Sequence, residues 1–254
     1  MGGSMTRNDD TAPIPVVVES PRARHAAPPP HHGAGWWAMR IARETGIVLA
    51  IALLASIVIR LVLAQPMYVP DAAMADTLQP GDRVLVAKGL SAVTGLSRGD
   101  VVAFADPGGW SDLPAPSVGI GDRMLAFLGL APATSGEEMV MRVIAVGGDR
   151  IACCNADGRI VLNGMPLAEA YLPAGMPTDQ VAFEVTVPED AVFVLGDDRV
   201  NARDSRYHLD TDSGAVPTSR LFGRATLVLW PLGHLQALTT PAEFADVPEP
   251  TVAP

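Results

Sequence analysis

The chain is poor in basic residues, and lysine is the scarcest of them. Of its 254 residues, 18 are Lys or Arg and 28 are Asp or Glu, which gives a formal net charge of -10 at pH 7. Nucleic-acid binding needs clustered basic side chains that neutralise phosphates, so we expect no nucleic-acid partner. Lys88 is the only lysine in the sequence. Chemistry that needs a lysine therefore has a single candidate.

Cysteine is also scarce. The two cysteines, Cys153 and Cys154, are adjacent in the sequence. A single pair excludes a scaffold built on several disulfides, and adjacent cysteines do not have the spacing of zinc ligands. We therefore expect neither a metal nor a cofactor. For the pair itself, two free thiols, a local redox pair in a turn and a vicinal disulfide all remain open.

One long apolar run lies in the first quarter of the chain. Residues 46–64 read GIVLAIALLASIVIRLVLA, nineteen residues that only Ser56 and Arg60 interrupt. This is about the length that a helix needs to cross a membrane, so we predict an uncleaved transmembrane anchor over residues 36–65. A cleaved signal peptide is disfavoured because the run begins well after the N-terminus and no small-residue cleavage site follows. A buried core helix is the structural alternative.

The arginines around the run predict its orientation. Arg22, Arg24, Arg40 and Arg43 are among the arginines that precede it, and the nearest basic residue after it is Arg83. By the positive-inside rule the N-terminus is cytoplasmic and the main domain extracytoplasmic. We expect a single-pass protein of the cytoplasmic membrane. Residues 1–35 lack apolar periodicity and are predicted to be a disordered cytoplasmic tail.

The chain beyond the run carries the signals of an all-β domain, which we assign to residues 66–238. Short β-branched runs alternate with Gly, Pro and Asp turns there. The expected strands cover residues 83–87, 100–105, 139–146, 159–162, 181–187, 192–195 and 225–230. Residues 106–138 are expected to form a loop-rich insertion, and the Pro-rich, acidic residues 239–254 a disordered tail.

Four sequence blocks follow one another within this region. They are MYVPDAAMADTLQPGDRVLV at 67–86, RGDVVAF at 98–104, MRVIAVGGD at 141–149 and GDDRVNARDSRY at 196–207. Together they resemble the motifs of bacterial type I signal peptidases (family S26), with an actinobacterial flavour, over roughly residues 40–235. One block alone is weak evidence, but four in order behind one apolar run are specific. The resemblance implies a mainly antiparallel β domain behind one N-terminal transmembrane helix.

The resemblance also implies a reaction, for which this chain lacks the groups. The family is a family of serine endopeptidases in which a neutral lysine is the general base for the serine nucleophile. By motif, the nucleophile position is Ala73 and the general-base position Met141. The position of the oxyanion hydroxyl is Asp71, and that of the serine that orients the lysine is Ala202. None of the four carries the required group, which implies a catalytically inactive homologue.

The residues that brace the site in the family are present. They are Met74, Arg142, Asp197, Arg199, Asp204 and Arg206. A role in holding the fold fits them as well as a role in a working site. Relocated chemistry has two candidates, a Ser205–His208 pair and an Asp71–Asp76 pair. The first has no lysine, and the second lies in one short loop without the two lobes of an aspartic protease.

These observations favour a membrane-anchored homologue that binds signal-peptide or preprotein segments, or pairs with an active signal peptidase. Binding an extended segment by strand addition needs backbone donors and pockets, but no nucleophile. The alternatives are an active signal peptidase, a serine endopeptidase whose dyad lies elsewhere, and a structural membrane protein with a vestigial groove.

Overall fold

The structure is a computed structural model that describes residues 33–62, 64–88, 95–110, 119 and 138–250. The chain divides into two compact units, residues 1–46 and 47–254. The predicted cytoplasmic tail lies outside the described residues up to residue 32, as does most of the predicted insertion over 106–138.

The helix α1 covers Ala34–Val62. Its sequence is rich in Ala, Leu, Ile and Arg and contains no proline, a composition that a helix accepts. The helix ends at Val62, before the end of the predicted anchor at residue 65, because Ala64 already begins the strand β1 (Ala64–Tyr68). The residue before Pro66 is biased towards extended backbone, which ends the helix. Among the helices that the structure describes, none combines the length and the apolarity that a membrane crossing requires.

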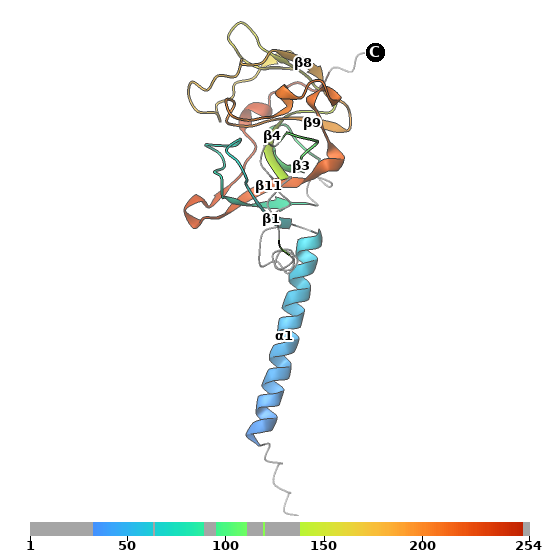
Figure 1. Cartoon of the computed structure of the whole chain (residues 1–254), viewed down its shortest axis with the longest axis vertical. Coiled ribbons are helices and arrows are strands. Elements are labelled where there is room, and N and C mark those ends of the chain that lie inside the picture. The colour runs from blue at the N-terminus through green and yellow to red at the C-terminus, as the bar shows by residue number, and fades with distance from the viewer. Residues whose placement is uncertain (1–32, 63, 89–94, 111–118, 120–137, 251–254) are drawn as a thin grey trace, which may run out of the picture. The chain divides into compact units, whose positions relative to one another are not determined.

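Two antiparallel sheets form the β domain (Figure 1). In the described part of the chain, the larger sheet has eight strands in the order β1-β2-β11-β3-β4-β9-β10, with β12 paired to β11. Its strands are β1 Ala64–Tyr68, β2 Arg83–Ala87, β3 Val101–Ala105, β4 Glu138–Val146, β9 Ala191–Leu195, β10 Val216–Pro217, β11 Leu221–Trp230 and β12 Gln236–Ala237. The second sheet has the order β7-β6-β5-β8. Its strands are β5 Arg150–Cys153, β6 Val161–Leu162, β7 Met165–Pro166 and β8 Phe183–Thr186.

The expected antiparallel β domain is therefore confirmed, with differences in single strands. Pattern reasoning missed β1, whose sequence AQPMY has no β-branched residue. Pro66 is tolerated there because β1 lies at the edge of the sheet. The strand β11 begins earlier than expected, because Gly223 allows the backbone to continue at a bulge. A side chain at Gly223 would lie 2.3 Å from the carbonyl oxygen of Ala87.

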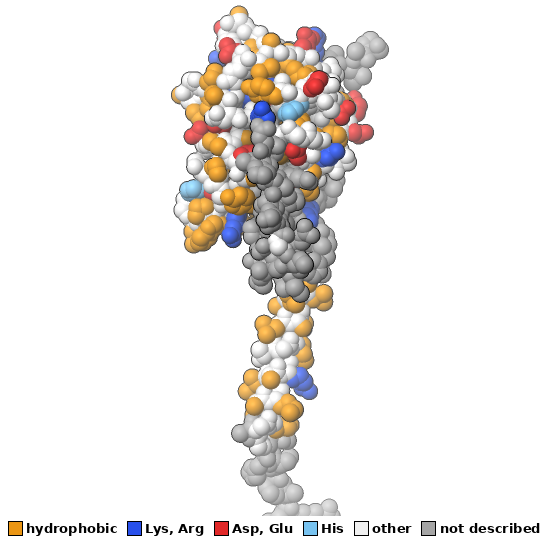
Figure 2. Space-filling view, in the orientation of Figure 1, with side chains coloured by type: hydrophobic (Ala, Val, Ile, Leu, Met, Phe, Trp, Pro, Cys, Tyr) orange, Lys and Arg blue, Asp and Glu red, His pale blue; other side chains and the backbone are white. Residues whose placement is uncertain are grey.

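The strand β4 lies at the centre of the domain, between β3 and β9. Every residue from Met139 to Ala145 is buried, so both faces of the strand are covered. Neighbouring residues point to opposite faces, which sends Met141 to one side of the sheet and Arg142 to the other. On the visible surface, by contrast, acidic, basic and apolar side chains are interspersed (Figure 2). Arginines that are buried in the interior, unlike those on the surface, need specific partners for their charge.

The described part of the predicted C-terminal tail is folded, which corrects the expectation of disorder over 239–254. A short 3-10 helix covers Ala242–Phe244, and Phe244 and Val247 are buried in a hydrophobic core cluster. The Phe244 ring stacks on Tyr171 with 5.9 Å between ring centroids. Proline and acidic residues suggested disorder, but two buried apolar side chains hold this segment against the domain, together with hydrogen bonds from Asn163 and Arg98 to the carbonyl oxygens of Pro248 and Val247.

The substitution Phe244→Ala tests this correction. We expect it to lower the free energy of unfolding by about 3–5 kcal/mol, because it leaves a cavity in a closed core. Leu232→Ala is the control, since Leu232 is 70% exposed; its effect should stay within about 0.5 kcal/mol. Chemical denaturation of the two variants beside the natural protein measures both. Equal effects would show that the C-terminal segment contributes nothing to the core.

Candidate functional site

The loop between β1 and β2 carries the first group of candidate residues. The backbone N–H of Val69 donates to the carbonyl oxygen of Asp82 at 2.9 Å, which closes the loop. Inside it, the carbonyl oxygen of Met74 accepts a hydrogen bond from the N–H of Leu78 at 2.7 Å. The Met74 and Leu78 side chains are fully buried. The loop is thus anchored on both sides of Ala73.

The Asp71 carboxylate is engaged with the backbone of this loop. Its Oδ1 accepts a hydrogen bond from the N–H of Ala73 at 3.0 Å. In acyl transfer, such an N–H at the nucleophile position is a natural donor for the developing oxyanion. Here a negative charge already occupies that donor. The position expected to hold an oxyanion hydroxyl therefore carries a group that competes with an oxyanion.

The loop that follows β9 meets the first loop at Ala73. The N–H of Asp198 donates to the carbonyl oxygen of Ala73 at 3.0 Å. A side chain at Gly196 would lie 2.4 Å from that oxygen and 2.3 Å from Cβ of Ala202. Only glycine fits between the two. The structure thus brings together two positions, 73 and 202, that lie far apart in the sequence.

Met141 completes this group from β4. Ala73, Met141 and Ala202 are 7%, 1% and 2% exposed and belong to one buried apolar cluster. The other buried members are Val102, Phe104, Trp110, Met139, Val143, Val192, Val194 and Val216. An apolar setting of this kind would lower the pKa of a lysine and so keep it neutral as a base. In this chain it surrounds a methionine, whose thioether does not take up a proton at neutral pH.

Arg142 lies on the opposite face of β4 and forms a buried ion pair. Its Nε and Nη2 donate to the two carboxylate oxygens of Asp197 at 2.8 and 2.6 Å, and its Nη1 donates to the carbonyl oxygen of Gly99 at 2.9 Å. Thr77 Oγ1 donates to the same carboxylate at 2.6 Å. Burial alone would lower the pKa of Arg142, but the hydrogen bonds and charge of Asp197 outweigh it, so the pKa is raised.

Arg199 has partners that sequence reasoning missed. It donates from Nη1 to Glu169 Oε2 at 3.1 Å and also binds Glu169 Oε1, which accepts a hydrogen bond from the Tyr171 hydroxyl at 2.8 Å. The Tyr171 ring lies under the Arg142 guanidinium, with 4.5 Å from Cζ to the ring centroid. Burial, followed by the charge of Glu169, raises the pKa of Tyr171 well above its usual value. No motif contains Glu169 or Tyr171; only their burial beside two arginines marks them.

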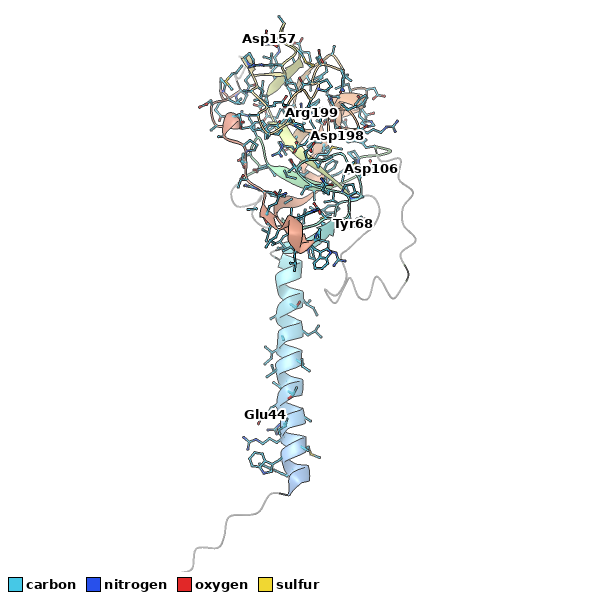
Figure 3. The ribbon with its side chains drawn as sticks, turned by 90° about the vertical axis from the view of Figure 1, so that its left-hand side faces the viewer. Glu44, Tyr68, Asp106, Asp157, Asp198 and Arg199 are labelled. Atoms are coloured by element: carbon cyan, nitrogen blue, oxygen red, sulfur yellow. A yellow bond between two sulfur atoms is a disulfide. The ribbon has the colours of Figure 1, made fainter. Side chains whose placement is uncertain are left out.

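Asp204 and Arg206 hold the rest of the second loop. Arg206 Nε and Nη2 bind the two oxygens of Asp204, each at 2.8 Å, and Nη2 also donates to the carbonyl oxygen of Arg199 at 2.9 Å. Asp204 Oδ2 accepts a hydrogen bond from the N–H of Gly196 at 3.1 Å. Figure 3 shows Arg199 and Asp198 inside the β domain. The charged residues expected to brace the site are all paired, and the Arg142–Asp197 pair joins this loop to β4.

The relocated dyad is not assembled. The hydroxyl oxygen of Ser205 accepts a hydrogen bond from the N–H of Val194 at 2.9 Å, and Ser205 is fully buried. The His208 ring stacks on Trp110 instead, with 4.5 Å between ring centroids. Burial lowers the pKa of His208, although the charges of Asp106 and Asp210 oppose this. Among the described residues, no hydrogen bond joins the Ser205 hydroxyl to the His208 ring.

Comparison with known proteins matches these blocks to a family. The family described as "Signal peptidase, peptidase S26" matches residues 42–230. The chain belongs to this family. Signal peptidase I of Mycobacterium tuberculosis (strain ATCC 25618 / H37Rv) is 34% identical over 215 residues, which cover 74% of this chain and 72% of that protein. The probable signal peptidase I of Mycobacterium leprae (strain TN) is 33% identical over 225 residues, with 74% and 76% covered.

Among solved structures, a signal peptidase I from Enterococcus faecalis V583 matches with a TM-score of 0.35 and 24% identity. The match covers 52% of this chain and 97% of that one. The family membership rests on the sequence matches. It agrees with the resemblance drawn from the four sequence blocks. Those blocks resemble actinobacterial members of the family, and the two relatives named above are mycobacterial.

The substitution Asp197→Asn tests whether the Arg142 ion pair holds the site together. Removing the negative charge leaves the Arg142 guanidinium buried without a counter-charge, so we expect a loss of about 3–5 kcal/mol in the free energy of unfolding. The matched control is Glu184→Gln, which removes the acid of an exposed pair with Arg150; we expect it to cost less than about 1 kcal/mol. Urea denaturation followed by circular dichroism compares them. A loss for Asp197→Asn no larger than that of the control would contradict the bracing role.

Proposed function

We propose that this signal peptidase family member binds signal-peptide or preprotein segments and does not cleave them. The observation that carries the proposal is the buried apolar cluster at Ala73, Met141 and Ala202. In the reading by motif, these are the positions of the nucleophile, its base and the group that orients the base. The cluster offers no nucleophile and no proton acceptor for acyl transfer.

The hydrogen bond of Asp71 supports the same proposal. A catalytic oxyanion needs donors that are free when negative charge develops. The Ala73 N–H is taken by a carboxylate at 3.0 Å, which would also repel the oxyanion. Activity would therefore require more than the return of a serine and a lysine. This argues against an active signal peptidase, the principal alternative.

Retention of the bracing network favours binding over a vestigial groove. Arg142, Arg199 and Arg206 are buried and fully paired, and they hold the two loops that meet at Ala73. Extended segments can add to strand edges by backbone hydrogen bonds alone, without a reacting group. A preprotein or a signal peptide is the ligand that we propose, and an active signal peptidase is the alternative partner.

The decisive experiment compares three forms of the full chain in detergent with a preprotein that carries an Ala-x-Ala site. They are the natural protein, Ala73→Ser with Met141→Lys, and the same pair with Asp71→Ser and Ala202→Ser. We expect no cleavage by the natural protein. The fourfold variant should exceed the twofold variant by about 100-fold in kcat, because it frees an oxyanion donor. Mass spectrometry of the products measures cleavage.

Binding is measured on the natural protein in parallel. A fluorescent signal peptide should bind saturably, and the same peptide with Phe-x-Phe in place of Ala-x-Ala should bind at least about tenfold more weakly, a difference of about 1.4 kcal/mol. Cleavage of the preprotein by the natural protein would overturn the proposal in favour of an active peptidase. Absence of both cleavage and binding would leave a structural role.

We also propose that the apolar residues 46–64 anchor the chain in the cytoplasmic membrane, with the N-terminus inside and the β domain outside. The support is their sequence, which Ser56 and Arg60 alone interrupt. The natural protein is then expected to stay in the membrane pellet during alkaline carbonate extraction. Leu53→Arg with Leu54→Arg should release it, because each central arginine costs about 2.5–3.5 kcal/mol in a membrane helix. Glu44→Gln is the control and should stay in the membrane pellet. If this control were released to the same extent as the double-arginine variant, the result would count against the anchor.

A further inference from the structure

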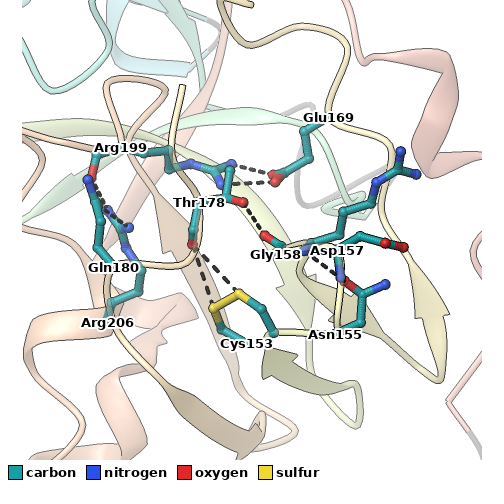
Figure 4. The surroundings of a disulfide bond; sticks show 11 residues. Cys153, Asn155, Asp157, Gly158, Glu169, Thr178, Gln180, Arg199 and Arg206 are labelled. Atoms are coloured by element: carbon teal, nitrogen blue, oxygen red, sulfur yellow. Dashed lines mark hydrogen bonds and ion pairs between the residues drawn. A yellow bond between two sulfur atoms is a disulfide. The ribbon is translucent and has the colours of Figure 1, made fainter. Parts of the chain in front are cut away.

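The two cysteines form a disulfide at the end of β5. Cys153 and Cys154 are bonded to each other, which decides among the options that the sequence left open. Both are partly exposed. The carbonyl oxygen of Thr178 lies 3.6 Å from Sγ of Cys153 and 3.8 Å from Sγ of Cys154 (Figure 4). One backbone carbonyl of a distant loop therefore faces both sulfurs.

That carbonyl belongs to the 167–182 loop, which connects β7 to β8. Near its start, Glu169 binds Arg199, and Tyr171 packs under Arg142. Near its end, Gln180 Oε1 accepts a hydrogen bond from Arg206 Nη1 at 3.3 Å. The loop thus contacts all three buried arginines of the site. Figure 4 shows the disulfide, Thr178 and the Arg199–Glu169 pair in one neighbourhood.

We propose that Cys153–Cys154 is a thiol–disulfide exchange site whose redox state sets the order of the 167–182 loop. The co-reactant is a dithiol. One of its thiolates attacks a protein sulfur, breaking the Cys153–Cys154 bond and forming a mixed disulfide; its second thiolate then displaces the protein sulfur. Two electrons pass to the protein, both cysteines gain a proton, and the dithiol leaves as a disulfide.

Reduction of the Cys153–Cys154 bond changes the contact between the two sulfurs and the carbonyl oxygen of Thr178. The covalent bond keeps the two sulfurs close enough for both to contact one carbonyl oxygen. Without the bond they separate to van der Waals distance, so at least one sulfur leaves its present position. Thiols are also weak donors, whereas disulfide sulfurs carry no proton, so the contact changes in kind as well as in place. Thr178 also donates from Oγ1 to the carbonyl oxygen of Gly158 at 2.6 Å, so displacement of this residue disturbs a second anchor.

The shift passes along the loop to the arginines. Gln180 follows Thr178 by two residues and holds Arg206. Towards the start of the loop, Tyr171 and Glu169 hold Arg142 and Arg199. The Gln180 contact is the nearest to Thr178 along the loop, so displacement of Thr178 acts first on the Arg206 hydrogen bond. The exchange site would therefore act on the bracing network of the candidate site.

The experiment measures the loop directly and so does not depend on the proposed peptide binding. The natural protein is incubated with or without dithiothreitol, and the cysteines are alkylated under native conditions. The chain has no other cysteines, so each alkyl group reports this pair. We expect two alkyl groups after reduction and none before. Amide hydrogen exchange of residues 167–182 should become on the order of tenfold faster in the reduced protein.

Cys153→Ser with Cys154→Ser is the matched variant, and it should show the faster exchange without reductant and no response to it. Glu184→Gln, on the neighbouring strand β8, is the control and should respond to reductant as the natural protein does. The natural protein keeps the test valid even if the serine variant does not fold. Cysteines that resist native reduction overturn the proposal, as does reduction that leaves the exchange of the loop unchanged.

Discussion

The buried ion pair between Arg142 and Asp197 joins the middle of the larger sheet to the loop after β9. Burying two charges costs several kcal/mol per ion unless hydrogen bonds satisfy them, and this pair has a bidentate geometry with further bonds to Gly99 and Thr77. Through Thr77 the pair also reaches the loop that carries Ala73. Three chain segments therefore share one electrostatic centre, and the positions of Ala73 and Ala202 depend on it.

Side chains along β4 alternate between the two faces of the sheet, so the neighbouring residues 141 and 142 lie in different environments. Met141 enters an apolar cluster, and Arg142 enters a network of charges and hydrogen bonds. In a working dyad the apolar side would hold a neutral base, while the polar side would hold the loops in register. Here the polar side is intact and the apolar side is filled by a methionine. The buried charges and the apolar cluster thus lie on different faces of the same strand.

Much of the fold could be predicted from local pattern, because β2, β4 and β9 are short runs rich in β-branched residues between turns. The strand β1 could not, since a proline at a sheet edge leaves no such pattern. The motifs predicted that positions 73, 141 and 202 come together. They did not predict that Asp71 binds the Ala73 N–H, or that Glu169 and Tyr171 serve the arginines. Glu169 and Tyr171 lie in a loop whose sequence has no hydrophobic periodicity, so their contacts with the arginines can be recognised only in the structure. The folded C-terminal segment was missed for a similar reason, because two anchoring side chains do not make a pattern.

The position of β11 has a consequence for how the protein acquires its structure. This strand lies near the end of the chain, yet it pairs with β2 on one side and with β3 on the other. The strands β2 and β3 therefore pair with a strand that lies more than 100 residues later in the chain. Contacts between residues so distant in sequence lower the folding rate. Until Leu221–Trp230 has been synthesised, β2 and β3 present unpaired edges. The larger sheet is consequently completed only once residues 221–230 have been made, and until then its two early parts have no strand between them.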